Sequence, residues 1–299
     1  MACHVSRSSL RLAAIVTSLC TCLTAAALTT SSASAAQEHN ASTSLVSELA
    51  DCKAPKTGKP TVVLIHGAWA DTSSWSGEVR LLREAGYPVR AIGNPLRDLT
   101  SDSRTVAEFL RTIKGPVVLA GHSYGGSVIT NAAAQTDNVK ALVYVDAAAP
   151  AIGETTGELS GETSALNTSP PEELYDKVPY PGAPSGAADL YLKKDVFLKN
   201  FAGDLPAGQA ADLWATQRAA SSAAFSTPSK YEAWRKIPSW YFISTGDQII
   251  TPESEEMMAR RAHSKVTKFQ GGSHLTLISH PDAVSSVIGS AICSVRGSR

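Results

Sequence analysis

The sequence Pro116-Val-Val-Leu-Ala-Gly-His-Ser-Tyr-Gly-Gly126 places an apolar run directly before a serine that is flanked by glycines. The run predicts a buried strand, and residues 127–133 are compatible with a helix. A serine at so sharp a turn is forced into a strained backbone conformation, and Gly121 and Gly125 leave room for strand and helix to pass closely. The G-x-S-x-G pattern therefore predicts that Ser123 is lifted clear of the sheet edge. The alternative is an ordinary Gly-rich loop.

Apolar runs alternate with helical patterns on both sides of this turn. Continuous apolar runs of this length are typical of strands that are buried on both faces of a parallel sheet. The alternation predicts a doubly wound, mainly parallel α/β sheet of about six strands with helices on both faces. Besides the strand that ends at Ser123, we expect strands at 61–65, 87–92, 139–145, 239–244 and 266–269.

The rhythm of strands and helices breaks after the fourth strand, between residues 148 and 237. Residues 153–187 are rich in Gly, Ser, Thr and Pro, and helical patterns follow around 188–201, 209–219 and 230–235. We expect a helical lid over the carboxyl edge of the sheet, where ligands of open α/β sheets bind. The core then comprises 61–147 and 238–299. Four aromatic residues of the lid either line a pocket or pack the lid's own helices: Trp214, Phe225, Tyr231 and Trp234.

Residues 1–36 have the pattern of a cleaved signal peptide. Arg7 and Arg11 precede a mostly apolar stretch, 12–28, and Ala33-Ser34-Ala35 fits the small residues of a cleavage site. An uncleaved membrane anchor is the alternative, but polar residues interrupt the apolar stretch. The sequence therefore predicts a secreted, extracellular protein with no membrane attachment after cleavage.

The charges are balanced, with 27 Lys and Arg against 27 Asp and Glu. No basic run stands out, so the sequence offers no electrostatic footprint for nucleic acid or an anionic membrane. Neither H-E-x-x-H nor C-x-x-C occurs after the signal peptide, and we expect no metal and no cofactor. We expect a small, largely uncharged substrate.

Two of the five cysteines remain once the signal peptide is removed. Cys52 lies in the N-terminal arm, residues 37–60, and Cys293 lies near the end of the chain. An even pair in an exported protein predicts a disulfide, although two buried free thiols are the alternative.

Polar groups with catalytic chemistry follow three of the predicted strands. In chain order they are Ser123, Asp247 and His274, the order expected of nucleophile, acid and base on a sheet of this kind. A serine hydroxyl needs a base to remove its proton, which is the role expected of His274. Asp247 would fix the tautomer of His274 and stabilise its imidazolium form.

Other residues compete for two of these roles. Asp146 ends the fourth strand and could replace Asp247 as the acid. His280 lies six residues beyond His274 and could replace it as the base, although its place beside Pro281 suits a helix start. The remaining candidates are expected to shape turns or to lie on the surface at a helix end: His66, His122 and His263.

Three segments, 63–69, 121–126 and 271–274, resemble those of the α/β-hydrolase superfamily. Within it they are similar to the small plant methylesterase and hydroxynitrile lyase branch and its bacterial esterase-like relatives. The resemblance covers roughly 61–292 and implies a six-stranded core with a helical lid. The lyases carry a lysine immediately after the catalytic histidine, where this chain has Leu275, which argues against a dedicated lyase.

The resemblance also implies an oxyanion hole formed by the backbone N–H groups of Tyr124 and of Ala68, which follows Gly67. Such donors stabilise the negative charge that develops during acyl transfer. The function expected is that of a secreted serine hydrolase that cleaves a carboxylic ester through an acyl-enzyme. An amidase, a lactonase or a lyase-like relative with the same triad remains open, as does a catalytically silent binding module.

Overall fold

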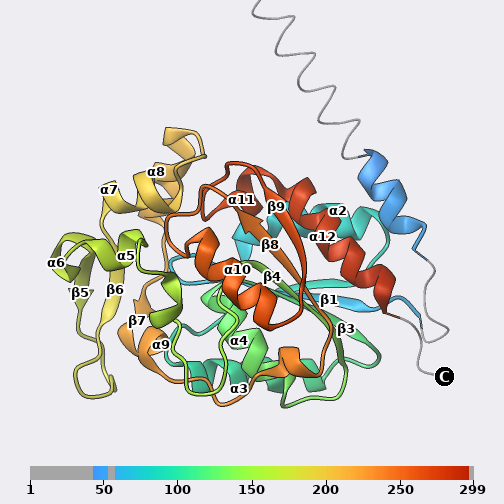
Figure 1. The fold of residues 1–299 in the computed structure, drawn as a ribbon, viewed down its shortest axis with the longest axis horizontal. Coiled ribbons are helices and arrows are strands. Elements are labelled where there is room, and N and C mark those ends of the chain that lie inside the picture. Colours follow the sequence, from blue (N-terminus) through green and yellow to red (C-terminus); the bar gives the residue numbers. More distant parts are fainter. Residues whose placement is uncertain (1–42, 53–57, 296–299) are drawn as a thin grey trace, which may run out of the picture. The chain divides into compact units, whose positions relative to one another are not determined.

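The computed structural model describes residues 43–52 and 58–295 (Figure 1). The chain divides into two compact units, Met1–Ser44 and Leu45–Arg299, and the fold belongs to the second. The predicted signal peptide, 1–36, and part of the predicted arm lie outside the described residues. Within the described ranges, no helix combines the length and apolarity needed to cross a bilayer.

A six-stranded parallel sheet forms the centre of the fold, in the order β2-β1-β3-β4-β8-β9. This confirms the predicted doubly wound sheet. The middle strands are apolar and buried along nearly their whole length, as expected for strands covered on both faces. The strands are β1 (Thr61–Ile65), β2 (Val89–Ile92), β3 (Val117–Ser123), β4 (Val139–Ala147), β8 (Ser239–Ser244) and β9 (Lys265–Phe269).

Helices cover both faces of this sheet (Figure 1). One pair, α2 and α12, packs together, and another pair, α3 and α4, packs together on the opposite face. Local signals set where they begin: Asp98 caps α3, and Thr251 caps α10 just before Pro252. The helices of the core are η1 (Thr72–Trp75), α2 (Ser76–Glu84), α3 (Leu99–Arg111), α4 (Tyr124–Ala133), α10 (Pro252–Arg261), α11 (Thr276–Ser279) and α12 (Pro281–Ser294).

The turn between β3 and α4 is strained at Ser123, whose φ is 56° and ψ is −127°. A Cβ atom on Gly121 would lie 2.5 Å from the carbonyl oxygen of Gly125. A Cβ atom on Gly125 would lie 2.5 Å from the carbonyl oxygen of Ile65. Both positions therefore require glycine, and their spacing around the serine allows the strand to turn directly into the helix.

The insertion, residues 148–238, connects β4 to β8 and contains both helices and strands. The insertion contains helices, as expected, but it also contains a three-stranded antiparallel sheet of β5, β6 and β7 that was not predicted. The predicted helix at 188–201 begins instead as β6, where Leu190 and Leu192 point inward while Asp189 and Tyr191 are half-buried. That alternation has the period of a strand.

The elements of the insertion are short. Its strands are β5 (Tyr175–Val178), β6 (Asp189–Leu192) and β7 (Ala220–Ser221). Its helices are η2 (Glu158–Ser160), α5 (Ala165–Thr168), α6 (Pro171–Leu174), α7 (Lys194–Val196), the π-helical turn η3 (Phe197–Phe201), α8 (Ala207–Ala215), α9 (Ser222–Ser226) and η4 (Ala233–Arg235).

The N-terminal helix over residues 43–50 leads into a disulfide between Cys52 and Cys293, whose Cα atoms are 5.2 Å apart. Leu49 packs against α12 at Gly289, and the hydroxyl of Tyr87 donates to the carbonyl of Leu49 at 2.7 Å. Residues near the two ends of the chain are therefore joined both covalently and by packing.

We expect reduction of this disulfide to lower the melting temperature of the protein prepared without its predicted signal peptide, residues 1–36. The bond closes a loop with a sequence separation of 241 residues. The chain-entropy model gives about 5.5 kcal/mol for so long a loop, as an upper value. Calorimetry with and without reductant measures the effect, and the Cys52→Ser, Cys293→Ser double variant is the control that reductant should leave unchanged. Two free thiols per chain in the denatured, unreduced protein would contradict the bond.

Candidate active site

Three side chains from distant parts of the chain meet at the carboxyl edge of the sheet. Ser123 ends β3, Asp247 follows β8, and His274 follows β9. Nε2 of His274 lies 2.7 Å from Oγ of Ser123, and its Nδ1 lies 2.6 Å from Oδ2 of Asp247. All three residues are buried. The structure thus brings the three predicted catalytic residues, Ser123, His274 and Asp247, into one chain of hydrogen bonds, which we call the catalytic row.

Burial and the hydrogen-bond donors around Asp247 set the protonation states of the catalytic row. Burial raises the pKa of the Asp247 carboxyl, while hydrogen bonds from the backbone N–H groups of Ile249 and Ile250 oppose that rise. Burial lowers the pKa of His274 to about 3, so the imidazole is neutral at rest. With two backbone donors on Asp247, we assign the negative charge to Asp247 and the shared proton to Nδ1 of His274. Nε2 is then free to accept the proton of Ser123.

The loop after β1 lies against the nucleophile. A Cβ atom on Gly67 would lie 2.5 Å from Cβ of Ser123 and 3.1 Å from its Oγ, so this approach requires glycine. The next residue, Ala68, is therefore close to Ser123. Tyr124 begins α4, where backbone N–H groups have no partner within the helix. Of the two predicted oxyanion donors, Tyr124 directly follows the serine, and Ala68 directly follows the glycine that contacts it.

The two competing residues make other contacts. Asp146 bonds to the backbone N–H and the hydroxyl of Ser244, at 2.7 and 2.9 Å, rather than to His274. His280 is the N-cap residue of α12, and its ring centroid is 4.7 Å from that of Phe269. The geometry therefore favours Asp247 and His274 for the roles of acid and base.

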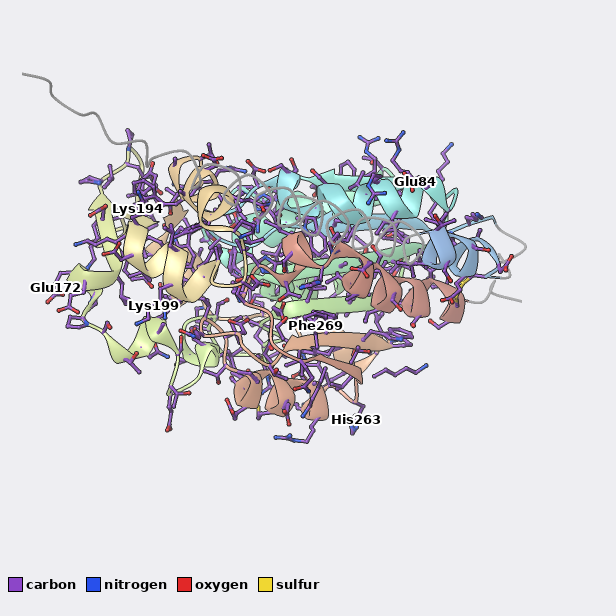
Figure 2. All side chains as sticks on the ribbon, turned by 90° about the horizontal axis from the view of Figure 1, so that it is seen from above. Glu84, Glu172, Lys194, Lys199, His263 and Phe269 are labelled. Carbon is purple, nitrogen blue, oxygen red and sulfur yellow. A yellow bond between two sulfur atoms is a disulfide. The ribbon has the colours of Figure 1, made fainter. Side chains whose placement is uncertain are left out.

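Two of the three other candidate histidines, His66 and His122, make structural contacts. Nε2 of His122 lies 2.8 Å from the carbonyl of His274, and burial lowers the pKa of His122 well below its usual value. His66 accepts a hydrogen bond from the backbone N–H of Asn94 at 2.9 Å, and burial lowers its pKa to about 4. Both are neutral and hold their loops. His263 is exposed beyond the end of α10 (Figure 2).

Aromatic rings surround the loop beside the nucleophile. Trp69 stacks on Phe225 and on Tyr175, with ring centroids 5.3 and 5.9 Å apart, and meets Phe201 edge-on. The ring of Phe201 lies 5.1 Å from that of His274. A cavity of about 30 Å³ opens beside Trp69, Phe201 and Leu275. The walls near the catalytic row are therefore largely apolar.

Of the four aromatic residues proposed for a lid pocket, Phe225 is the one that reaches this cluster. Trp214 donates to the carbonyl of Leu192, and Trp234 donates to that of Pro150. Tyr231 is 42% exposed. Sequence reasoning missed Tyr175 and Phe201, which lie in short elements without a clear periodic pattern.

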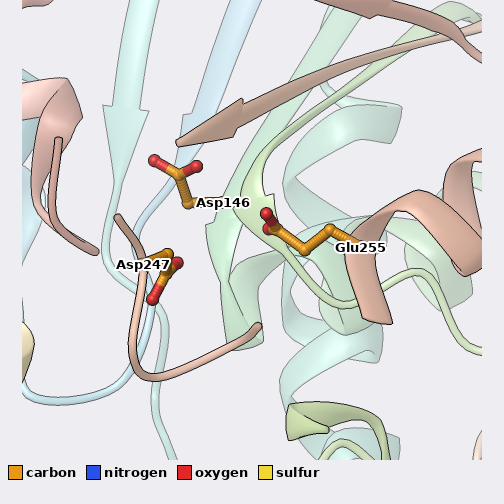
Figure 3. Close-up of side chains that lie close together, drawn as sticks. All are labelled: Asp146, Asp247 and Glu255. Carbon is orange, nitrogen blue, oxygen red and sulfur yellow. The ribbon is translucent and has the colours of Figure 1, made fainter. Parts of the chain in front are cut away.

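Asp247 also belongs to a cluster of three carboxyl groups (Figure 3). Oxygen atoms of Asp146, Asp247 and Glu255 all lie within 4.8 Å of one another, and all three residues are buried. Figure 3 shows the carboxyl group of Glu255 pointing from α10 toward the two aspartates. Sequence reasoning missed Glu255. The available signal was its position on the inward face of α10, shared with Met258 and Ala259.

Known proteins resemble this chain in sequence and in fold. The model of the alpha/beta hydrolase family matches residues 62–287. A pyrethroid hydrolase of Sphingobium wenxiniae is 28% identical over 247 residues, which cover 76% of this chain and 85% of that protein. An alpha/beta hydrolase of Aspergillus novofumigatus, nvfD, is 28% identical over 256 residues, which cover 78% and 96%.

Among solved structures, an extracellular alpha/beta-hydrolase from a Paenibacillus species has a TM-score of 0.64 and 23% sequence identity. The match covers 78% of this chain and 98% of that one. At this identity the likeness shows a shared fold.

Proposed function

Since the chain belongs to the alpha/beta hydrolase family, we propose that it is a serine hydrolase that cleaves a small, largely uncharged carboxylic ester through an acyl-enzyme. The observation that carries the proposal is the hydrogen-bonded row of Ser123, His274 and Asp247. A hydroxyl, a neutral imidazole and a carboxylate in this order are what activation of a serine requires.

In the proposed reaction, Oγ of Ser123 attacks the ester carbonyl while Nε2 of His274 takes the hydroxyl proton. The backbone N–H groups of Ala68 and Tyr124 stabilise the oxyanion, a contribution of about 3 kcal/mol for each donor in comparable sites. His274 then gives its proton to the leaving alcohol. Water, activated by His274 in turn, releases the acid from Ser123. Asp247 stabilises the imidazolium in both halves of the reaction.

The surroundings of the row support an uncharged substrate. The rings of Trp69, Tyr175, Phe201 and Phe225 provide apolar contacts, and the one acidic side chain in the cavity lining, Asp71, would repel an anionic group. Burying a charged substrate group against these rings without a partner would be costly. The relative named a pyrethroid hydrolase supports hydrolysis as the reaction.

We also propose that the protein is exported. The basic, apolar and small-residue regions within 1–36 support this, as does the disulfide between Cys52 and Cys293, because such bonds persist in oxidising compartments. N-terminal sequencing of protein from the culture medium is expected to begin near Ala36. Full-length protein retained in the cytoplasm of the native host would contradict export.

A screen of chromogenic esters tests the catalytic proposal. We expect hydrolysis of neutral aryl and alkyl esters, with kcat/KM dependent on acyl length, and much slower cleavage of anionic esters of similar size. The matching anilides and lactones separate an esterase from an amidase or a lactonase. Absence of any turnover, together with tight binding of one of these compounds, would favour a silent binding module.

A further inference from the structure

A buried row of polar groups connects Asp146 to the segment that carries His274. Oδ2 of Asp146 lies 2.9 Å from Oγ of Ser244, which lies 2.8 Å from Oγ1 of Thr276. The hydroxyl of Thr276 lies 2.7 Å from the carbonyl oxygen of Ser273, the residue directly before His274. All four residues are buried. The row thus joins the end of β4, the end of β8 and the loop after β9.

Counting hydrogen atoms along this row determines the protonation of Asp146. The Ser273 carbonyl only accepts, so the hydroxyl of Thr276 must donate to it. The oxygen of Thr276 then accepts from Ser244, which uses the single hydroxyl hydrogen of Ser244. The remaining contact, between Ser244 and Oδ2 of Asp146, therefore needs a hydrogen on Asp146. Its other oxygen accepts from the backbone N–H of Ser244 at 2.7 Å, as a neutral carboxylic acid can.

The neighbouring carboxyl groups lead to the same assignment. Asp247 receives hydrogen bonds from the Ile249 and Ile250 N–H groups and from His274. The carboxyl group of Glu255 makes no hydrogen bond of good geometry among the described residues, and the backbone N–H of Ala147 is the one donor that approaches it. Like charges this close in a buried cluster strongly disfavour ionisation of more than one group. Burial, and then the charge of Asp247, raise the pKa of Asp146 well above its usual value. Burial likewise raises the pKa of Glu255.

The groups that face the cluster from other elements do not neutralise it. From β8, the hydroxyl of Tyr241 donates to the carbonyl of Ala147 rather than to a carboxyl group. From α10, Arg261 pairs with Glu154, with nitrogen–oxygen distances of 2.5 and 2.7 Å. Asp204, in the insertion, adds negative potential at Asp146. His274 pairs with Asp247.

Protonation of two carboxyl groups explains this cluster better than a bound cation does. A hard cation such as Ca²⁺ takes six to eight oxygen ligands. Every carboxyl oxygen of Asp146 and Asp247 is already hydrogen-bonded, so only the carboxyl group of Glu255, which the backbone N–H of Ala147 approaches, could offer further ligand atoms. All three carboxyl side chains are also closed off from solvent.

We propose that Asp146 is a positioning residue that acts as a neutral acid: it donates to Ser244 and so starts a directed row of hydrogen bonds that fixes the His274 loop. Glu255 is a second neutral acid, and the negative charge of the cluster stays on Asp247. The proposal rests on the proposed function in one respect, the role of His274 as the base.

Kinetics of paired variants test the positioning role. Asn at position 146 can accept from the backbone of Ser244 and donate to its hydroxyl, so Asp146→Asn is expected to keep kcat within about threefold. Asp146→Ala removes the start of the row and is expected to lower kcat by about tenfold or more, with KM little changed, because small misplacements of a catalytic group are costly. Thr276→Ser and Thr276→Val form a second pair with the same expected contrast, usable if Asp146→Ala does not fold.

Infrared spectroscopy tests the protonation without any substrate. The folded wild-type protein at neutral pH is expected to show the C=O stretch of protonated carboxylic acids, with part of the band lost in Asp146→Asn and part in Glu255→Gln. Glu253→Gln, on the exposed side of α10, is the matched control and should leave the band unchanged.

Three results would overturn the proposal: no such band in the wild-type protein, an Asp146→Asn variant as impaired as Asp146→Ala, or a stoichiometric divalent cation in the purified protein whose removal lowers the melting temperature. A band that behaves as expected in a protein that cleaves no ester would support the protonation of Asp146 and reject the proposed function alone.

Discussion

Replacing Ser123 with alanine will abolish ester hydrolysis while the protein stays folded. In the proposed reaction the hydroxyl is the attacking group, and loss of the nucleophile from a triad that acts as a unit can cost about 10⁶-fold in kcat. Alanine is smaller than serine, so it fits the space between β3 and α4, although it inherits the strained φ of 56°. Single-turnover and steady-state rates measure the loss, and circular dichroism checks the fold.

Ser290→Ala, on the exposed side of α12, is the control for a serine-to-alanine change away from the site. It should hydrolyse the ester at the wild-type rate. If Ser123→Ala also hydrolysed the ester at the wild-type rate, another group would have to be the nucleophile, and the proposal of an acyl-enzyme on Ser123 would be wrong.

Asp247→Asn is expected to reduce kcat by about 10⁴-fold, the size of effect known for a wrong histidine tautomer in a triad. The amide NH₂ of the new side chain can donate to Nδ1 of His274, which lies 2.6 Å from Oδ2 in the wild-type protein. The imidazole then carries its hydrogen on Nε2, facing Ser123, and can no longer accept the serine proton. Steady-state kinetics on the best ester of the screen measures the loss.

The same change at the neighbouring aspartate provides the comparison. Asp146→Asn keeps the shape and the donors of a neutral acid, so most of the activity should remain. Were the ranking of the two variants reversed, Asp146 would be the acid partner of the base.

The sequence alone predicted the sheet because each strand has a residue pattern that can be recognised within its own segment. The run at 61–65 matches β1, and that at 239–244 matches β8, since strands buried on both faces must be continuously apolar. The expected strand at 87–92 starts later, at Val89, because Tyr87 and Pro88 complete the turn after α2. Ser123 was identifiable because the whole G-x-S-x-G pattern lies in one short segment. The clash that requires Gly121 is with Gly125 in the same turn, whereas the clash that requires Gly125 is with Ile65 of β1.

The parts that sequence could not predict depend on contacts between distant segments. Residues 175–178 and 189–192 are too short to separate strand from helix by periodicity, and they become strands by pairing with each other. The row from Asp146 through Ser244 to Thr276 joins three segments, and no spacing along the chain marks it. Glu255 shares the inward face of α10 with Met258 and Ala259, but an acid in the first turn of a helix is common, so its approach to the two aspartates was not predictable.

The bond between Cys52 and Cys293 also changes what a protease can do to this molecule. Ser123, Asp247 and His274 all lie within the loop that it closes, as does the whole insertion. A single cleavage in the insertion would therefore leave two fragments, one with the serine and the other with the acid and the base, still covalently linked. Such a nicked enzyme would migrate as two fragments on a denaturing gel only after reduction, and its two halves would refold at the high effective concentration of a tethered pair.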